Sequence, residues 1–128
     1  MKLIEVPLGG RTYYARFSLR VLAEFEEKSL ERGGNGNAQE EIALLLSNGK
    51  PSDLLWVISR LIEAGRRAAE LDGIDPVPPP LSYDDLLDLA GLEDLTFLYS
   101  LASGTMTRDT KTTVETAPAK NAEATPDL

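Results

Sequence analysis

The first residues of the chain alternate between apolar and polar side chains, which is the pattern of a β-strand with one buried face. The alternation runs over residues 4–8, and the pair Gly9-Gly10 separates it from a second segment over residues 11–17. Two glycines allow the positive φ angles of a tight hairpin turn. The sequence therefore predicts a two-stranded antiparallel hairpin in which Val6 lies opposite Tyr13.

Apolar residues then recur at spacings of three and four, which is typical of helices with one buried face. A first helix is expected after Ser18, whose hydroxyl can cap it, with Leu19, Leu22, Ala23 and Phe25 on its apolar side. A second helix is expected after Asn37. An isolated hairpin is only marginally stable in water. We therefore expect the hairpin to pack on the helix over residues 19–27.

The longest apolar stripe predicts a helix from about residue 52 to residue 71. Its first half carries Leu, Val and Ile, whereas its second half carries small residues that let another backbone approach closely: Gly65, Ala68 and Ala69. The prolines between Ile74 and Pro80 exclude a helix there and predict an extended connector. A rigid spacer is the simpler interpretation of this connector, and a polyproline ligand for a partner domain is the alternative.

Two short helices are expected next, one capped by Ser82 and one running from Leu92 to about Gly104. Beyond that point the chain is mostly Thr, Ala, Pro, Lys and Glu, with too few large apolar side chains to offset the entropy of ordering it. The expected organisation is one α+β, mainly helical domain over residues 1–104, with the hairpin followed by about five helices. A disordered polar tail over residues 105–128 is expected to follow.

Composition argues against several classes of protein. The chain contains no cysteine and no histidine, so disulfides, thiolate zinc sites and the commonest general base are missing. We therefore expect neither an enzyme nor a cofactor. No segment has the apolar length of a membrane span or of a signal peptide, so a cytoplasmic protein is the default expectation. The net charge of −8 makes nucleic acid an unfavourable partner.

Three aspartates within about one helical turn come nearest to the composition of a metal site: Asp84, Asp85 and Asp88. Helix capping explains two of them, because carboxylates are favoured at the N-terminus of a helix. No glycine-containing calcium loop surrounds them. No metal site is therefore expected.

Binding of another protein is the remaining class of function, and charged and aromatic residues indicate where it could occur. The outer part of the long helix carries three arginines among glutamates: Arg60, Arg66 and Arg67. Glu63 and Arg67 have the spacing of an ion pair, so a solvated charged face is the simpler interpretation and an acidic partner is the alternative. Aromatic and arginine side chains dominate the energetics of interfaces. The candidate partner-binding residues are Tyr14, Phe25, Trp56 and Arg60.

The order of these elements resembles a known family. Three segments carry the resemblance: Ala15-Arg16-Phe17-Ser18 at the end of the hairpin, the helix from Leu19 to Glu27, and Leu81-Ser82-Tyr83-Asp84-Asp85 after the long helix. Over about residues 2–104 the chain is similar to the tail assembly chaperones of long-tailed bacteriophages. These are small, acidic, largely helical proteins encoded just ahead of the tape measure protein.

The resemblance implies a non-enzymatic role: binding the tape measure protein, keeping it soluble, and helping tail tube subunits assemble around it before leaving. It also implies that a frameshifted longer form can recruit tube subunits. A structural adaptor, such as a connector or tail-completion subunit that stays in the particle, is the alternative. A DNA-mimicking inhibitor is a third interpretation, although the carboxylates here are spread among caps and helix faces. Self-association is left open.

Overall fold

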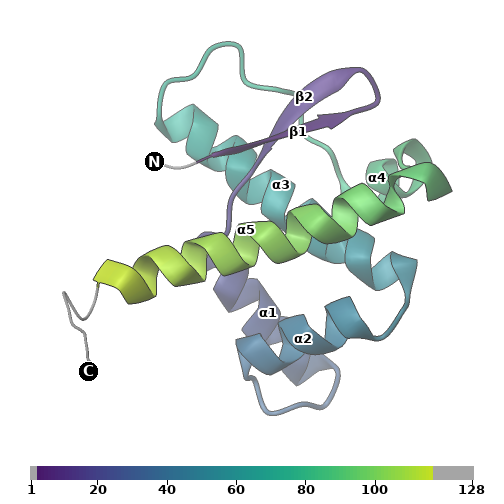
Figure 1. Ribbon diagram of the computed structural model, residues 1–128, viewed down its shortest axis with the longest axis vertical. Coiled ribbons are helices and arrows are strands. Elements are labelled where there is room, and N and C mark those ends of the chain that lie inside the picture. Colours follow the sequence, from purple (N-terminus) through teal and green to yellow (C-terminus); the bar gives the residue numbers. More distant parts are fainter. Residues whose placement is uncertain (1–2, 117–128) are drawn as a thin grey trace.

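A computed structural model gives the structure of residues 3–116, with side chains described as far as Thr105. An N-terminal antiparallel hairpin precedes five helices, which confirms the expected α+β, mainly helical fold (Figure 1). The elements in chain order are β1 (Ile4–Leu8), β2 (Arg11–Ala15), α1 (Leu19–Glu31), α2 (Ala38–Ser47), α3 (Pro51–Leu71), α4 (Tyr83–Leu89), the 3-10 turn η1 (Leu92–Asp94) and α5 (Leu95–Thr116).

The hairpin has the predicted register, with Val6 opposite Tyr13. Both turn glycines have positive φ angles, 58° at Gly9 and 79° at Gly10, which residues with a β-carbon rarely adopt. Alternation buries one face of the sheet against the helices. Tyr14 lies opposite Glu5 on the other face.

The hairpin packs chiefly on α3, which differs from the expectation that it packs on the helix over residues 19–27. The backbone N–H of Arg16, just after β2, donates to the carbonyl oxygen of Leu61 in α3 at 3.0 Å. This close approach occurs where the α3 stripe changes to small residues. α1 instead packs mainly on α2, with a smaller contact to α3.

Gly65 is the residue that allows the approach. A β-carbon added at this position would overlap the carbonyl oxygen of Tyr14 and crowd the backbone nitrogen of Ala15. The predicted close approach to the second half of α3 is confirmed at Gly65, and the backbone that it admits is β2.

α3 is the central helix of the fold. It contacts β2 and each of the other four helices, and α5 crosses it in Figure 1. The core is built around its apolar side, and its largest fully buried side chains include Phe25, Leu54, Ile58, Leu61, Leu86 and Leu98. Because α3 contacts β2 and each of the other helices, it fixes their positions relative to one another.

The predicted helix caps are confirmed. Three side chains accept a hydrogen bond from the backbone N–H three residues further on, which satisfies a donor that the helix leaves free: Ser18, Asn37 and Ser82. α3 begins at Pro51, a favourable residue for the first helical position because it needs no N–H partner there.

The last helix ends later than expected, at Thr116 rather than near Gly104. Thr105 is only 1 % exposed, so the helix still contacts the core just past Gly104. A glycine inside a helix costs only about 1 kcal/mol relative to alanine, which does not end a helix that has already formed. The tail expected over residues 105–128 therefore contains helix as far as residue 116, and its remaining part lies outside the described residues.

The contact at Gly65 gives a test of the packing. We expect Gly65→Ala to lower the free energy of unfolding by about 1–3 kcal/mol, because the added methyl group meets backbone atoms that cannot rotate away. Gly104→Ala is the matched control, since a β-carbon there meets nothing within 4 Å, and it should stabilise the protein by up to about 1 kcal/mol. Urea denaturation measures both changes. Equal effects of the two substitutions would contradict the close approach.

Candidate partner-binding surface

Phe25, one of the four predicted binding residues, lies inside the core. It is 0 % exposed, and its ring packs edge-to-face on Trp56 with centroids 5.6 Å apart and on Phe17 with centroids 6.4 Å apart. Phe25 is therefore a packing residue and not a surface anchor, because α1 turns this side toward α3.

Trp56 and Arg60 are half-buried on α3 and are covered by side chains of α1. Lys28 places its Nζ 4.7 Å from the centroid of the Trp56 ring, and Glu24 lies 3.5 Å from the Arg60 guanidinium. The structure thus brings Phe25, Trp56 and Arg60 together where α1 meets α3. Tyr14 is half-buried on β2, and no contact between its side chain and these three is found among the described residues.

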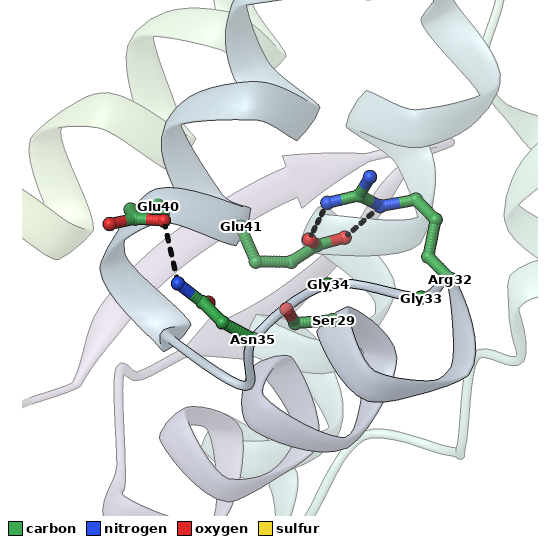
Figure 2. A pocket seen from close by; sticks show the side chains of 7 residues that line it. All are labelled: Ser29, Arg32, Gly33, Gly34, Asn35, Glu40 and Glu41. Atoms are coloured by element: carbon green, nitrogen blue, oxygen red, sulfur yellow. Dashed lines mark hydrogen bonds and ion pairs between the residues drawn. The ribbon is translucent and has the colours of Figure 1, made fainter.

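A hollow of about 380 Å³ opens between the end of α1 and the start of α2, over the loop between them. Figure 2 shows the Arg32 guanidinium facing the Glu41 carboxylate across it. Arg32 donates through Nε to Glu41 at 3.2 Å and through a second nitrogen to the other carboxylate oxygen. The Glu41 side chain is 0 % exposed. This hydrogen bond raises the pKa of Arg32 above its ordinary value.

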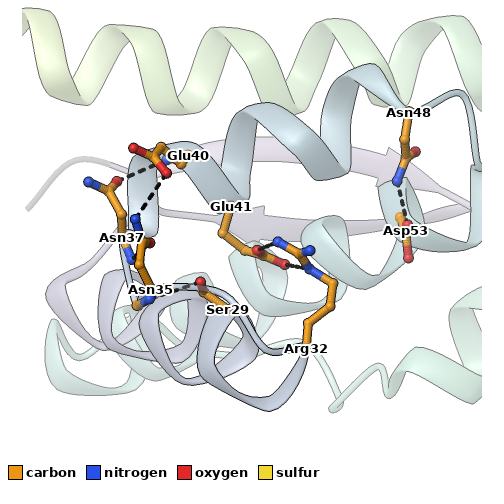
Figure 3. A network of polar contacts seen from close by, with 9 residues as sticks. Ser29, Arg32, Asn35, Asn37, Glu40, Glu41, Asn48 and Asp53 are labelled. Atoms are coloured by element: carbon orange, nitrogen blue, oxygen red, sulfur yellow. Dashed lines mark hydrogen bonds and ion pairs between the residues drawn. The ribbon is translucent and has the colours of Figure 1, made fainter.

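The polar groups around this hollow bond to one another (Figure 3). Ser29 accepts a hydrogen bond from the backbone N–H of Gly36 at 3.0 Å, and the Asn35 amide donates to Glu40 at 3.3 Å. These hydrogen bonds therefore fix the turn between α1 and α2, and they give the polar side chains around the hollow partners within the chain. Sequence reasoning missed Glu41, although its spacing from Leu45 puts a carboxylate on the apolar side of α2.

A second surface has the features of a binding site. A groove of about 580 Å³ runs between the start of α1 and the second half of α3. We call it the α1–α3 groove, and its lining is Arg16, Ser18, Leu19, Arg20, Ala64, Arg67, Ala68, Glu70 and Leu71. Leu19 and Leu71 are 84 % and 82 % exposed, although the sequence placed Leu19 on the apolar side of its helix. Sequence reasoning did not find this groove.

The α1–α3 groove is basic on a chain whose net charge is −8. Three arginines and one glutamate line it. Within the described part of the chain, the side chains of Arg16 and Arg20 form no ion pair, whereas Arg67 pairs with Glu63 at 3.1 Å. Two exposed leucines that share a groove with two unpaired arginines suit a partner that is both apolar and acidic.

The neighbouring charged face of α3 is an ion-pair network, as the spacing predicted. Glu63 binds Arg66 at 2.7 Å and Arg67 at 3.1 Å, and Arg66 also contacts Glu70 at 3.3 Å. The hydrogen bond from Arg66 holds the pKa of Glu63 below its ordinary value of 4.5, although partial burial acts in the opposite direction.

The described residues offer few other sites. Within them, no group of three or more His, Cys, Asp or Glu residues is arranged to hold a metal ion, and none of their helices has the length and apolarity to cross a membrane. Comparison of the chain with models of known families, with curated proteins and with solved structures found no match. The case for a function therefore depends on the chain itself.

The lowered pKa of Glu63 gives a pH-dependent prediction. A carboxylate whose pKa falls on folding stabilises the protein above about pH 4.5, and this contribution is lost as the pH falls through the folded-state pKa. We expect Glu63→Gln to lower the free energy of unfolding by about 1 kcal/mol at neutral pH. Urea denaturation across the pH range should show the difference from wild type disappearing in acid.

Glu26→Gln is the control for this prediction. Glu26 is exposed on α1 and makes no ion pair within the described residues, so its substitution should change stability little at any pH. A deficit of Glu63→Gln that persists unchanged in acid would rule out loss of the carboxylate charge as its cause.

Proposed function

We propose that this protein is a non-enzymatic tail assembly chaperone of a long-tailed bacteriophage, which binds the tape measure protein, keeps it soluble and helps to recruit tail tube subunits. The observation that carries this proposal is the α1–α3 groove, which is lined by exposed leucines and by arginines on an acidic protein. The resemblance in the order of elements supplies the identity of the client.

The groove suits a helical client. Apolar side chains at one face of an amphipathic helix can contact Leu19 and Leu71, which are largely exposed. Acidic residues flanking that face would meet the arginines, which favours one orientation and speeds encounter. The net charge of −8 then keeps the loaded complex soluble by repulsion between complexes.

The proposal places the protein in the host cytoplasm during assembly and outside the finished tail. It also expects a long reading frame for a coiled-coil-rich protein directly downstream of its gene. Stoichiometric amounts of the protein in purified virions would favour a structural adaptor or tail-completion subunit instead.

Charge reversal in the groove tests the proposal. Co-expression with the tape measure protein of the same genome should raise the soluble fraction of that client, and Arg20→Glu should remove most of the gain. A truncated interface anchor typically costs about 2 kcal/mol or more, which is roughly a thirtyfold loss of affinity. Arg20 lies in the first turn of α1, where a negative charge is favourable, so the fold should be retained.

Two further variants identify the surface that binds. Gln39→Glu, at an exposed position of α2, adds negative charge away from the groove and should leave client solubilisation unchanged. Tyr14→Ala tests the hairpin face that the sequence had indicated. Full solubilisation by Arg20→Glu, together with loss in Tyr14→Ala, would move the client from the groove to the hairpin.

A further inference from the structure

The two sides of the α1–α3 groove carry different charges. We call the lining residues 16–20 the α1 wall and the lining residues 64–71 the α3 wall. Arg16 and Arg20 belong to the α1 wall, and within the described residues neither of them forms an ion pair. The α1 wall therefore offers two cations that no side chain of the described residues neutralises.

The charged side chains of the α3 wall are paired within their own helix. Arg67 pairs with Glu63 at 3.1 Å, and Glu70 pairs with Arg66 at 3.3 Å. Glu63 also binds Arg66 at 2.7 Å, which joins two arginines and two glutamates into one network. Because this network has no net charge, the α3 wall attracts an acidic partner much less than the α1 wall does.

The α1 wall stays positive although a carboxylate follows it on the same helix. Glu24 is four residues after Arg20, which is the spacing of an ion pair along a helix. Glu24 instead lies 3.5 Å from the guanidinium of Arg60 on α3. The acidic side chain that is closest to Arg20 in sequence is therefore engaged elsewhere.

The groove has room for about two turns of a client helix. Its α3 wall runs from Ala64 to Leu71, which is about 10 Å at 1.5 Å per residue. Leu19 on the α1 wall and Leu71 on the α3 wall are its two largely exposed leucines. An amphipathic helix that contacts both leucines with its apolar face turns one edge of that face toward each wall.

The two edges of such a helix exchange places when the helix is reversed in the groove. Walls of unequal charge therefore distinguish its two directions. We propose that the α1–α3 groove recognises an amphipathic helix with acidic side chains along one edge of its apolar face, and that this edge faces Arg16 and Arg20. The groove thereby fixes the direction of the bound helix. This inference rests on the proposed function, because it describes the client of that groove.

The inference also describes the sequence of the client segment. In a helix with apolar residues at positions a and d of each heptad, positions e and g form the two edges of the apolar face. Acidic side chains at one of these positions meet the α1 wall, whereas acidic side chains at the other meet a network without net charge. The client segment should therefore carry Asp or Glu at e or at g, and neutral residues at the other position.

Two model peptides of identical composition test the direction. Both carry leucine at a and d over two heptads. One has Glu at e and Gln at g, and the other has Gln at e and Glu at g. Each peptide should place its acidic edge against the α1 wall, so moving the glutamates to the other edge should reverse the direction in which the peptide binds.

Disulfide cross-linking measures the direction, because the chain contains no cysteine of its own. Asp72→Cys places a thiol at the exposed end of α3, next to Leu71 of the groove. Each peptide is made with a cysteine at its N-terminus or at its C-terminus. We expect Asp72→Cys to link with one terminus of the first peptide and with the opposite terminus of the second. Gln39→Cys, exposed on α2 and outside the groove, is the control and should link with neither.

Substitutions of the two free arginines test the cause. Arg16→Gln and Arg20→Gln should each weaken binding of both peptides about twofold to fivefold, which is the range of an exposed ion pair. Combined with Asp72→Cys, the two substitutions together should allow both termini of either peptide to link equally. Arg16→Lys and Arg20→Lys keep the charge and should keep the direction. Fluorescence anisotropy of labelled peptides measures the affinities.

The outcomes separate this inference from the proposed function. Cross-linking of Asp72→Cys to the same terminus of both peptides, or equally to both termini of each, would overturn the inference while leaving the groove as a site that binds helices. Binding of neither peptide would overturn it as well. Co-expression of Arg20→Glu with the tape measure protein then decides separately whether the client uses the groove.

Discussion

β2 lies directly against α3 because residue 65 is glycine, and the position of the candidate binding surface follows from that contact. The strand backbone reaches the helix axis closely enough for Arg16 to donate to the carbonyl of Leu61. The chain therefore leaves the hairpin beside the second half of α3 and begins α1 there. Leu19 and Arg20 come next to Arg67 and Leu71 as a result, and the α1–α3 groove lies between them.

The charged residues of the protein fall into two groups, those that form ion pairs within the chain and those that do not. Glu41 on α2 is held by Arg32 at the end of α1, which ties two helices together, whereas Glu63 is held by Arg66 and Arg67 of its own helix. Arg16 and Arg20, just before and within the first turn of α1, form no ion pair within the described residues. Because a charge that is paired within the chain is less available to another molecule, these two unpaired arginines mark the groove on which the proposed function rests.

Local features were predictable from the sequence, because neighbouring residues determine them. Alternation with Gly9-Gly10 predicted the hairpin and its register, and Ser18, Asn37 and Ser82 predicted three helix starts. The small residues of α3 predicted a close approach but not its partner, since only the tertiary fold decides which backbone arrives. Phe25 was predicted to bind a partner but is buried, and Leu19 was predicted on the apolar side of its helix but is exposed. A helical period shows which side of a helix is apolar, but it does not show how far the helix extends past its neighbour.

Amide hydrogen exchange of the protein with and without its tape measure protein tests the central claim most directly. If the groove is the client site, binding should slow exchange at the start of α1 and in the second half of α3, over residues 19–22 and 64–71. Exchange in α4, which is not part of the groove, should remain unchanged. Protection confined to the hairpin or to α4, with the groove segments unaffected, would contradict the account.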